Sequence, residues 1–239
     1  MITMKKFATV IPVIAGLLMI TLFSSFIIKG NGNVVSEKRN VSEFTAIDVS
    51  HGFDVIITQG DACTVEVEAD ENLQEVIVTK VKNGVLHVYA KESIRKATKM
   101  TIYISFKELE MLEASGAVDL ETAGVVTGRK LEVRCSGASD LELFVEYEDI
   151  RIDVSGASDL DIEGSAHYLN ADVSGASDVD AFQLDAAKVI VDASGASNIK
   201  VHALKSIEAE ASGASDIKYK GNPEILGIST SGAGDVRKL

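Results

Sequence analysis

Acidic side chains return at a fixed place through the second half of this 239-residue sequence. A pentapeptide of the form SGASD occurs seven times with small variations, and all copies but one end in a carboxylate. If successive copies lie on neighbouring strands, these carboxylates are about 4.8 Å apart and repel by roughly 1 kcal/mol in water. Water and backbone N–H donors, or a bound cation, must offset that repulsion. The seven final residues are Asp119, Asp140, Asp159, Asp178, Asn198, Asp216 and Asp235.

Calcium is the cation that such a column could bind, because it takes several oxygen ligands at about 2.4 Å. The candidate ligands are Asp140, Asp159, Asp178 and Asp216. Hydration and backbone hydrogen bonds are sufficient without a metal, and calcium-binding β-rolls use a nine-residue repeat instead. We therefore predict no resident cofactor and keep a calcium-binding structural rod as an alternative.

Paired carboxylates in a groove can also hydrolyse glycosidic bonds, and β-helices host such enzymes. Catalytic groups usually depart from a repeat, whereas these acids belong to it. The sequence holds no HExxH or GxSxG motif and no spaced Cys/His set. We predict no catalytic residue, with a β-helix carbohydrate-active enzyme as the alternative. The four histidines fall at unrelated positions: His51, His87, His167 and His202.

The elements that carry these side chains follow from the sequence around each copy. Ile152 and Val154 alternate with polar residues before one copy, and Leu160 and Ile162 alternate after it. This period of two predicts half-buried strands, so one repeat is strand, corner, strand and return loop. Successive copies start 18 to 21 residues apart, at Ser115, Ser136, Ser155, Ser174, Ser194, Ser212 and Ser231.

A unit of this size cannot bury its thin apolar face alone, so the units must stack. The sequence predicts an all-β, single-stranded, right-handed parallel β-helix with about 19 residues per coil. A left-handed β-helix is the alternative, but its strict hexapeptides suit the variable spacing poorly. Stacking in register predicts an inward column of Ala114, Cys135, Val154, Val173, Ala193, Ala211 and Thr230.

The pentapeptide has a structural role in this scheme. Glycine and alanine allow a sharp corner and close approach of the coils, while serine and aspartate can bond nearby backbone groups. The structural repeat positions are Ser136, Gly137, Asp140, Ser155, Gly156, Asp159, Ser174, Gly175, Asp178, Ser194, Gly195, Asn198, Ser212, Gly213, Asp216, Ser231, Gly232 and Asp235.

The region before the regular repeat resembles a degraded form of it. Ile47, Val49, Ser50, Asp54 and Val55 align with the corresponding residues of the later copies. We therefore predict irregular coils over residues 41–110 and regular coils over residues 111–239.

The N-terminus has the composition of an export segment. Lys5 and Lys6 precede an apolar run from Phe7 to Ile28, as in a signal peptide or a membrane anchor, and Gly32 suits cleavage just after it. Residues 1–32 are predicted to direct export, and residues 33–239 to form the domain. We expect the protein in the cell envelope, as a periplasmic, surface or secreted protein. Only residues 7–28, if retained as a helix, would contact a membrane.

Two cysteines in an exported chain raise the question of a disulfide. Cys63 shares the phase of Val65 and Val67, and Cys135 shares that of Val133, so both point inward. We predict two buried thiols.

Charge narrows the class of partner. The net charge of -13 excludes nucleic acid, whose phosphates require a basic surface. The remaining partners are a glycan, a protein ligand or a second copy of the chain in a homo-oligomer.

One stretch, FTAIDVSHGFDVIITQGDACTVEVEADENL from Phe44 to Leu73, together with the SGASD ladder, resembles the auto-transporter adhesin head GIN domain family. The resemblance covers about residues 35–239. It implies a right-handed β-helix, an adhesin role at the cell surface and no catalytic residues. The sequence therefore predicts a non-enzymatic surface or envelope protein that acts as an adhesin-like binding or scaffold domain.

Overall fold

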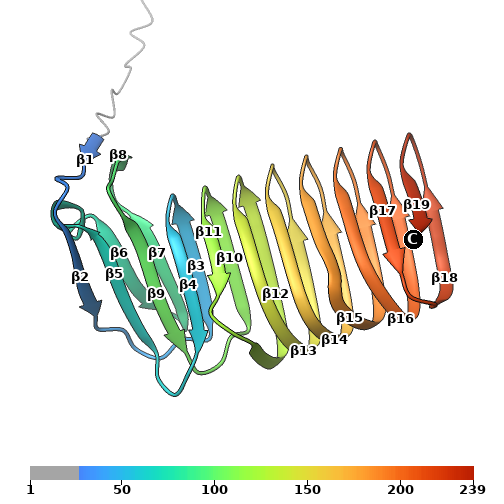
Figure 1. The fold of residues 1–239 in the computed structure, drawn as a ribbon, viewed down its shortest axis with the longest axis horizontal. Helices are drawn as coiled ribbons and strands as arrows, with labels where there is room; N and C mark the ends of the chain where they lie inside the picture. Colours follow the sequence, from blue (N-terminus) through green and yellow to red (C-terminus); the bar gives the residue numbers. More distant parts are fainter. Residues whose placement is uncertain (1–26) are drawn as a thin grey trace, which may run out of the picture.

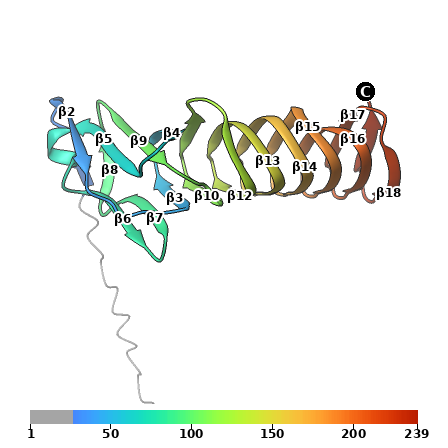
Figure 2. The same ribbon diagram turned by 90° about the horizontal axis from the view of Figure 1, so that it is seen from below.

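The structure is a computed structural model that describes residues 27–239. These residues are almost entirely β-strand and wind into a long stack of coils (Figures 1 and 2). The predicted all-β solenoid with about 19 residues per coil is confirmed. The predicted export or anchor helix lies outside the described residues apart from its end, where β1 (Ile27–Lys29) pairs in parallel with β8 (Ser93–Lys96). No helix within residues 27–239 is long and apolar enough to cross a membrane.

The regular coils are built from parallel strands whose inward side chains alternate with exposed ones. A long strand such as β13 leaves one corner, bends midway and returns to the next corner, so it supplies both sides of one coil (Figure 1). The strands are β10 (Met111–Gly116), β11 (Asp119–Thr122), β12 (Val126–Gly137), β13 (Asp140–Val154), β14 (Asp159–Val173), β15 (Asp178–Ala193), β16 (Asn198–Ala211), β17 (Asp216–Lys220), β18 (Glu224–Thr230) and β19 (Asp235–Lys238).

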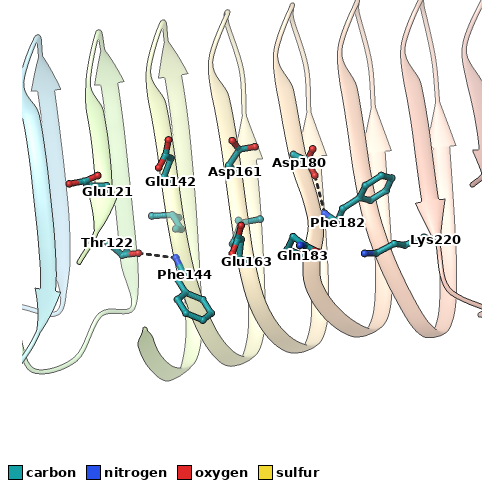
Figure 3. Close-up of a pocket in the computed structure, with 12 residues that line it drawn as sticks. Glu121, Thr122, Glu142, Phe144, Asp161, Glu163, Asp180, Phe182, Gln183 and Lys220 are labelled. Carbon is teal, nitrogen blue, oxygen red and sulfur yellow. Dashed lines mark hydrogen bonds between the residues drawn. The ribbon is translucent and has the colours of Figure 1, made fainter. Parts of the chain in front are cut away.

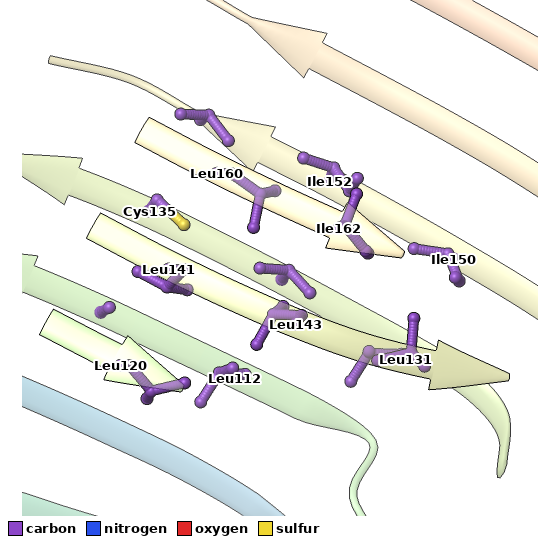
Figure 4. Packing of buried hydrophobic residues seen from close by; sticks show 14 of the residues in the cluster. Leu112, Leu120, Leu131, Cys135, Leu141, Leu143, Ile150, Ile152, Leu160 and Ile162 are labelled. Carbon is purple, nitrogen blue, oxygen red and sulfur yellow. The ribbon is translucent and has the colours of Figure 1, made fainter. Parts of the chain in front are cut away.

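The interior is filled by aliphatic layers. Leu141, Ile152 and Leu160 are buried between the two sides of the coils, as Figure 4 shows. The register of the predicted column is confirmed pair by pair, from Ala114 opposite Cys135 to Ala211 opposite Thr230, and its members are buried except Thr230, which is exposed. Stacking of like residues therefore explains this core.

Both cysteines are free thiols. Cys135 is buried as predicted, and burial raises the pKa of its thiol to about 12. The prediction for Cys63 is only partly right: its side chain is half-buried, and its Sγ lies 3.8 Å from the carbonyl oxygen of Phe44.

The degraded unit near residue 50 forms a coil that stacks in the predicted register. Strand β3 (Ala46–His51) pairs in parallel with β10, and β4 (Asp54–Gln59) pairs in parallel with β11, which sets Ser50 opposite Ser115 and Asp54 opposite Asp119. Strands β7 (Val85–Ala90) and β9 (Met100–Phe106) pair in parallel with β3 and β4 on the other side. The chain thus forms this coil, continues away from the regular coils through β5 to β9, and returns at β10 to continue the stack.

The outward excursion departs from the parallel coils that the sequence predicts. Strand β5 (Thr64–Asp70) is antiparallel to β9, β2 (Val34–Arg39) is antiparallel to β5, and β6 (Ile77–Lys82) is antiparallel to β7. A short 3-10 helix, η1 (Glu71–Leu73), connects the two sides. We call residues 27–106 without β3 and β4 the N-terminal cap.

The reversal has a local cause in the sequence. Asn83 and Gly84 follow β6 with φ of 53° and 79°, which is the positive-φ pair of a two-residue hairpin turn. Such a turn folds β7 directly back on β6 and forces antiparallel pairing. The Asn-Gly pair between two apolar stretches is the signal that the solenoid prediction missed.

The carboxylate of one residue, Asp70, holds several segments of the cap together. The buried carboxylate of Asp70 accepts hydrogen bonds from the backbone N–H groups of Gly32 and Thr98 and from the Thr98 hydroxyl. Burial by itself would raise the pKa of Asp70, but these hydrogen bonds together hold it below its ordinary value. The segment just before β2 is therefore fixed to the end of β5 and to the loop before β9.

Candidate functional site

The pentapeptide corners stack directly over one another. The glycine of each corner has positive φ, and a Cβ added to Gly156 would lie 2.6 Å from the carbonyl oxygen of Gly137 one coil earlier. Only glycine fits this combination of backbone angle and contact. The residue after each glycine also bonds the coil before it: the N–H of Ala157, for example, donates to the carbonyl oxygen of Gly137 at 2.8 Å.

Five of the seven corners have a second serine, which points into the core and is not among the residues that the sequence predicted as structural. The Oγ of Ser215 donates to the carbonyl oxygens of Ser212 at 2.8 Å and Ala193 at 2.9 Å. These hydroxyls satisfy buried carbonyl groups, which apolar side chains cannot do. The position could have been found from its period, because it continues the inward phase of the following strand. The buried members are Ser139, Ser158, Ser177, Ser197 and Ser215.

The final residues of the corners form one outward column, with Asp140 opposite Asp159 and Asp178 opposite Asn198. Burial, and then the neighbouring charges of Asp159 and Asp119, raise the pKa of Asp140. Asn198 relieves the repulsion locally, since its side-chain amide donates to Asp178 at 2.7 Å.

The calcium candidates lie in this column. Asp140, Asp159 and Asp178 occupy successive coils, and Asp216 follows Asn198. Among the residues that the structure describes, however, no three His, Cys, Asp or Glu side chains are arranged to hold a metal ion. Their geometry is that of an extended row, which provides no chelating cage.

A groove of about 660 Å³ lies beside the Asp column, on the side of the coils that follows each corner (Figure 3). We call this outer surface the groove face. Carboxylates of Glu142, Asp161 and Asp180 line one edge of the groove. The rings of Phe144 on β13 and Phe182 on β15 lie two coils apart along it, with Glu163 of β14 and the Gln183 amide between them. The Phe144 side chain is 42% exposed, although it lies in a regular strand.

The groove coincides with a break in the repeat. The pairing of β14 with β15 shifts between Asp161 and Gly164, and that of β15 with β16 shifts between Ala181 and Asp185, so residues 182–184 form a bulge. The N–H of Phe182 donates to the Asp180 carboxylate at 3.1 Å. Bulges often re-aim a side chain at a binding site. The 20-residue spacing of this coil was the signal in the sequence.

Charge along the groove face changes sign. The second outward position after each corner is acidic at Glu142, Asp161 and Asp180 and then basic at Lys200 and Lys218. At the junction, the Nζ of Lys200 lies 2.6 Å from Asp180. Burial, followed by the charges of Asp180 and Asp140, raises the pKa of Asp161. Two grooves of about 460 and 430 Å³ continue along the same acidic surface.

A cation also flanks the bulged ring. The Nζ of Lys220 lies 5.5 Å from the centre of the Phe182 ring, and that of Lys200 lies 5.8 Å from it. These contacts hold the ring in place by cation–π attraction. Together the groove offers apolar rings, hydrogen-bond acceptors, an amide and an ammonium group on a rigid sheet.

The histidines do not converge on this groove. His87 pairs with Asp48 at 2.8 Å, His202 pairs with Asp185 at 2.7 Å, and His167 packs against Tyr168. His51 occupies the corner of the β3–β4 coil, with φ of 88°. Each histidine thus has different neighbours, and the four do not share one site.

The fold and the groove define a class: an elongated β-solenoid that presents a shallow, mixed-polarity groove on a flat face. The model of the family described as "Putative auto-transporter adhesin, head GIN domain" matches residues 43–223. The chain belongs to that family. No curated protein matches the chain.

Solved structures show the same fold. A "putative adhesin" from Bacteroides fragilis has a TM-score of 0.83 at 24% identity, over 89% of this chain and 100% of that one. A "putative lipid binding protein" from Parabacteroides distasonis has a TM-score of 0.74 at 23% identity, over 90% of this chain and 100% of that one. A "putative adhesin" from Parabacteroides merdae has a TM-score of 0.71 at 20% identity, over 89% and 99%.

Proposed function

We propose that the protein is a non-enzymatic, adhesin-like binding module of the cell surface or envelope, and that the groove beside Phe144 and Phe182 binds a glycan. The observation that carries this proposal is a pair of rings along one groove: Phe144, exposed on β13, and Phe182, half-buried on β15, where the bulge sets Gln183 outward beside it. Sugar rings present apolar C–H faces and hydroxyl groups together. Aromatic rings beside carboxylates and an amide match both.

A second groove of about 550 Å³ lies on the opposite side of the coils, beside Tyr168 and Arg151. Its strands keep regular register, with Tyr168 opposite Asp149 and Lys188. No bulge or second ring marks it. The Phe182 groove is therefore the preferred site, and Tyr168 supplies a matched control because its side chain is 44% exposed.

The acidic row argues for binding rather than catalysis. Glycosidases use two carboxylates whose environments drive their pKa values apart. Here Glu142, Asp161 and Asp180 belong to one repeating column on equivalent strands. An interior lipid site is also disfavoured, because buried side chains such as Leu143, Ile162 and Val201 fill the core.

Glycan-array binding with residues 27–239 tests the proposal. We expect the wild-type protein and Tyr168→Ala to bind the same glycans, and Phe144→Ala to bind them about tenfold more weakly, as for truncation of a binding hot spot. Absence of any signal, or equal loss in Tyr168→Ala alone, would remove the groove as the site. Cleavage of a bound glycan would refute the non-enzymatic assignment.

Export is part of the proposal. Family membership and the apolar run of residues 7–28 support a location in the envelope. Fractionation of the source cells should place the protein outside the cytoplasm, either in a soluble fraction if residues 1–32 are removed or in a membrane fraction if they are retained.

A further inference from the structure

Charges on the groove face are segregated along the stack. The second outward position after each corner forms one row, because each of these residues lies opposite the next in the parallel pairing. Neighbours in such a row are about 4.8 Å apart. Acids come first and bases follow, and Figure 3 shows the acids side by side on successive strands. We call these residues the charged row: Glu121, Glu142, Asp161, Asp180, Lys200, Lys218 and Arg237.

The charged row is only partly neutralised by its own chain. The Nζ of Lys200 lies 2.6 Å from Asp180, and Arg237 lies 3.9 Å from Asp235. The other members form no ion pair within residues 27–239. All members are exposed or half-buried. The face therefore presents an acidic half and a basic half to any surface that docks on it.

We propose that the groove face binds the same face of a second copy of the chain, with the two stacks antiparallel, in a two-fold dimer. The two-fold axis lies between the two faces and runs parallel to the strands, between β15 and β16. This rotation reverses the order of the coils but keeps the direction of the strands. Each acid then lies opposite a base of the second copy: Asp180 opposite Lys200, Asp161 opposite Lys218, and Glu142 opposite Arg237.

A further pair follows from the same rotation. Glu163 comes two residues after Asp161, and Lys220 comes two residues after Lys218, so both continue outward on the groove face. Because the rotation keeps the strand direction, Glu163 lies opposite Lys220 of the second copy. The exposed ring of Phe144 is covered in the same interface, which adds apolar area to the charged contacts.

Other face-to-face arrangements bring like charges together. An axis along the stack would make the two copies parallel and set Asp161 against Asp161 of the second copy. Moving the strand-parallel axis onto β15 or β16 would set Asp180 or Lys200 against the same residue of the second copy. Only the axis between these two strands leaves no like pair in the charged row, so the charges themselves select the register.

The expected dimer is weak. Its interface measures roughly 30 Å along the stack and 17 Å along the strands, or about 500 Å² per chain, which is the size of a transient contact. At the corner edge of the face, Asp178 meets Asn198 of the second copy, but Asp159 meets Asp216 of the second copy and repels it. Exposed ion pairs contribute little each. We therefore expect a Kd between about 10 µM and 1 mM.

Sedimentation equilibrium and light scattering on residues 27–239, which contain the whole described core, test the proposal. From ~1 µM to ~1 mM the wild-type protein should convert reversibly from monomer to dimer. Asp161→Lys sets a lysine against Lys218 of the second copy and should weaken dimerisation about tenfold or more. Asp172→Lys is the matched control: Asp172 is also exposed on β14, between Asp153 and Asp192 on the opposite side of the coil. It should leave the dimer intact.

Mixing two variants gives a more specific test. Lys218→Glu sets a glutamate against Asp161 of the second copy and should also weaken dimerisation about tenfold. An equal mixture of Asp161→Lys and Lys218→Glu should form a heterodimer, and the double variant a homodimer, because opposite charges then meet again. Melting temperatures should not fall, since each new side chain lies between opposite charges of its own row.

Three results would overturn the proposal: a monomer at all concentrations, an equal loss in Asp172→Lys, or a mixture of the two single variants that stays monomeric. The dimer covers the Phe182 groove, so a second copy and a bound glycan would compete for this face. No glycan enters these experiments, however. A monomer would leave the proposed glycan site standing, and a blank glycan array would leave the dimer standing.

Discussion

The N-terminal cap and the regular coils solve the same packing problem in different ways. In the cap, antiparallel strands are held by single contacts such as those of the Asp70 carboxylate, which no other carboxylate within residues 27–239 duplicates. In the coils, each contact recurs at every level, so that Ser158 and Ser177 do the same thing one coil apart. Singular contacts specify where the stack begins, and repeated contacts extend it.

This difference teaches where substitution should matter most. In a stack, a contact between coils depends on the residue above and the residue below, so a side chain that intrudes disturbs two ladders at once. In the cap, the surroundings of a turn are open to solvent, and a similar change affects one turn only.

Glycine at two positive-φ positions gives the sharpest contrast. Gly156→Ala should lower the free energy of unfolding by about 3 to 4 kcal/mol, since left-handed strain adds to a backbone clash 2.6 Å from Gly137. Gly84→Ala, with φ of 79° and nothing within 4 Å, should cost only about 1 to 2 kcal/mol. Urea unfolding monitored by circular dichroism measures both. Equal losses would show that the corners do not stack closely.

The Asp70 contact should show how much the cap depends on one residue. Asp70→Asn should cost about 3 kcal/mol, because a buried charged acceptor of several backbone N–H groups is lost. Hydrogen exchange should rise in β5 and around Thr98 while the regular coils stay protected. The control is Asp61→Asn on an exposed loop, which should change nothing measurable.

Low pH should weaken the hydrogen bonds that the Asp70 carboxylate accepts. The pKa of Asp70 is lowered in the folded protein, so its contribution to stability is present above the unfolded pKa. That contribution is lost as the pH falls through the folded pKa. The cap should therefore lose exchange protection in acid before the coils do, and the opposite order would contradict this assignment.

Loss of a buried serine hydroxyl should lower the free energy of unfolding less than Gly156→Ala or Asp70→Asn does. Ser215→Ala removes two hydrogen bonds to the carbonyl oxygens of Ser212 and Ala193 and should cost about 1 kcal/mol. The column tolerates apolar residues in the first coils, where Phe53 and Val118 are buried at the corresponding place. Ser231→Ala, at an exposed corner serine, is the control; a larger loss there would reverse the roles of the two serines.

The smallest expected effect is an increase in the free energy of unfolding. Asp161→Asn removes repulsion from Asp180 and Asp140 and should stabilise the protein by roughly 0.5 to 1 kcal/mol at neutral pH. Because the folded pKa of Asp161 is raised, folding favours its protonated form. The wild-type protein has that stability in full below the unfolded pKa and loses it as the pH rises through the folded pKa.

The advantage of Asp161→Asn should accordingly vanish in acid. Thermal melting at neutral and acidic pH measures the difference, with Glu75→Gln in the cap as a neutral control. About 1 mM calcium, the range of extracellular calcium sites, should leave the wild-type melting temperature unchanged. A rise with calcium that Asp161→Asn or Asp140→Asn abolishes would revive the metal role of the acidic column.

The coils could be predicted from the sequence because their information is repeated. Seven corners in one phase fix the register, and the β3–β4 coil was predicted because residues 47–57 align with the later copies. The cap could not be predicted in this way, since its β-strand pattern is compatible with parallel or antiparallel neighbours. Only Asn83–Gly84 signalled the reversal, and right-handed winding stays a prediction.

The candidate site was missed for the opposite reason. The sequence prediction relied on acids such as Asp140 and Asp159, which recur in the pentapeptide. The groove is lined by Phe144 and Phe182, which are not part of the pentapeptide. An extra residue in the coil that begins at Ser174 was treated as tolerance in the spacing. The structure shows it as the bulge that places Gln183 outward beside Phe182.

Calorimetric titration with a glycan selected on the array tests the central claim most directly, namely that binding resides in the groove at the bulge of residues 182–184 and not in the repeated column. We predict one site per chain, about tenfold weaker in Phe182→Ala and unchanged in Asp159→Asn, which alters the repeated column only. Several equivalent sites per chain, or equal loss in Asp159→Asn, would show that the ladder itself binds and would contradict the account.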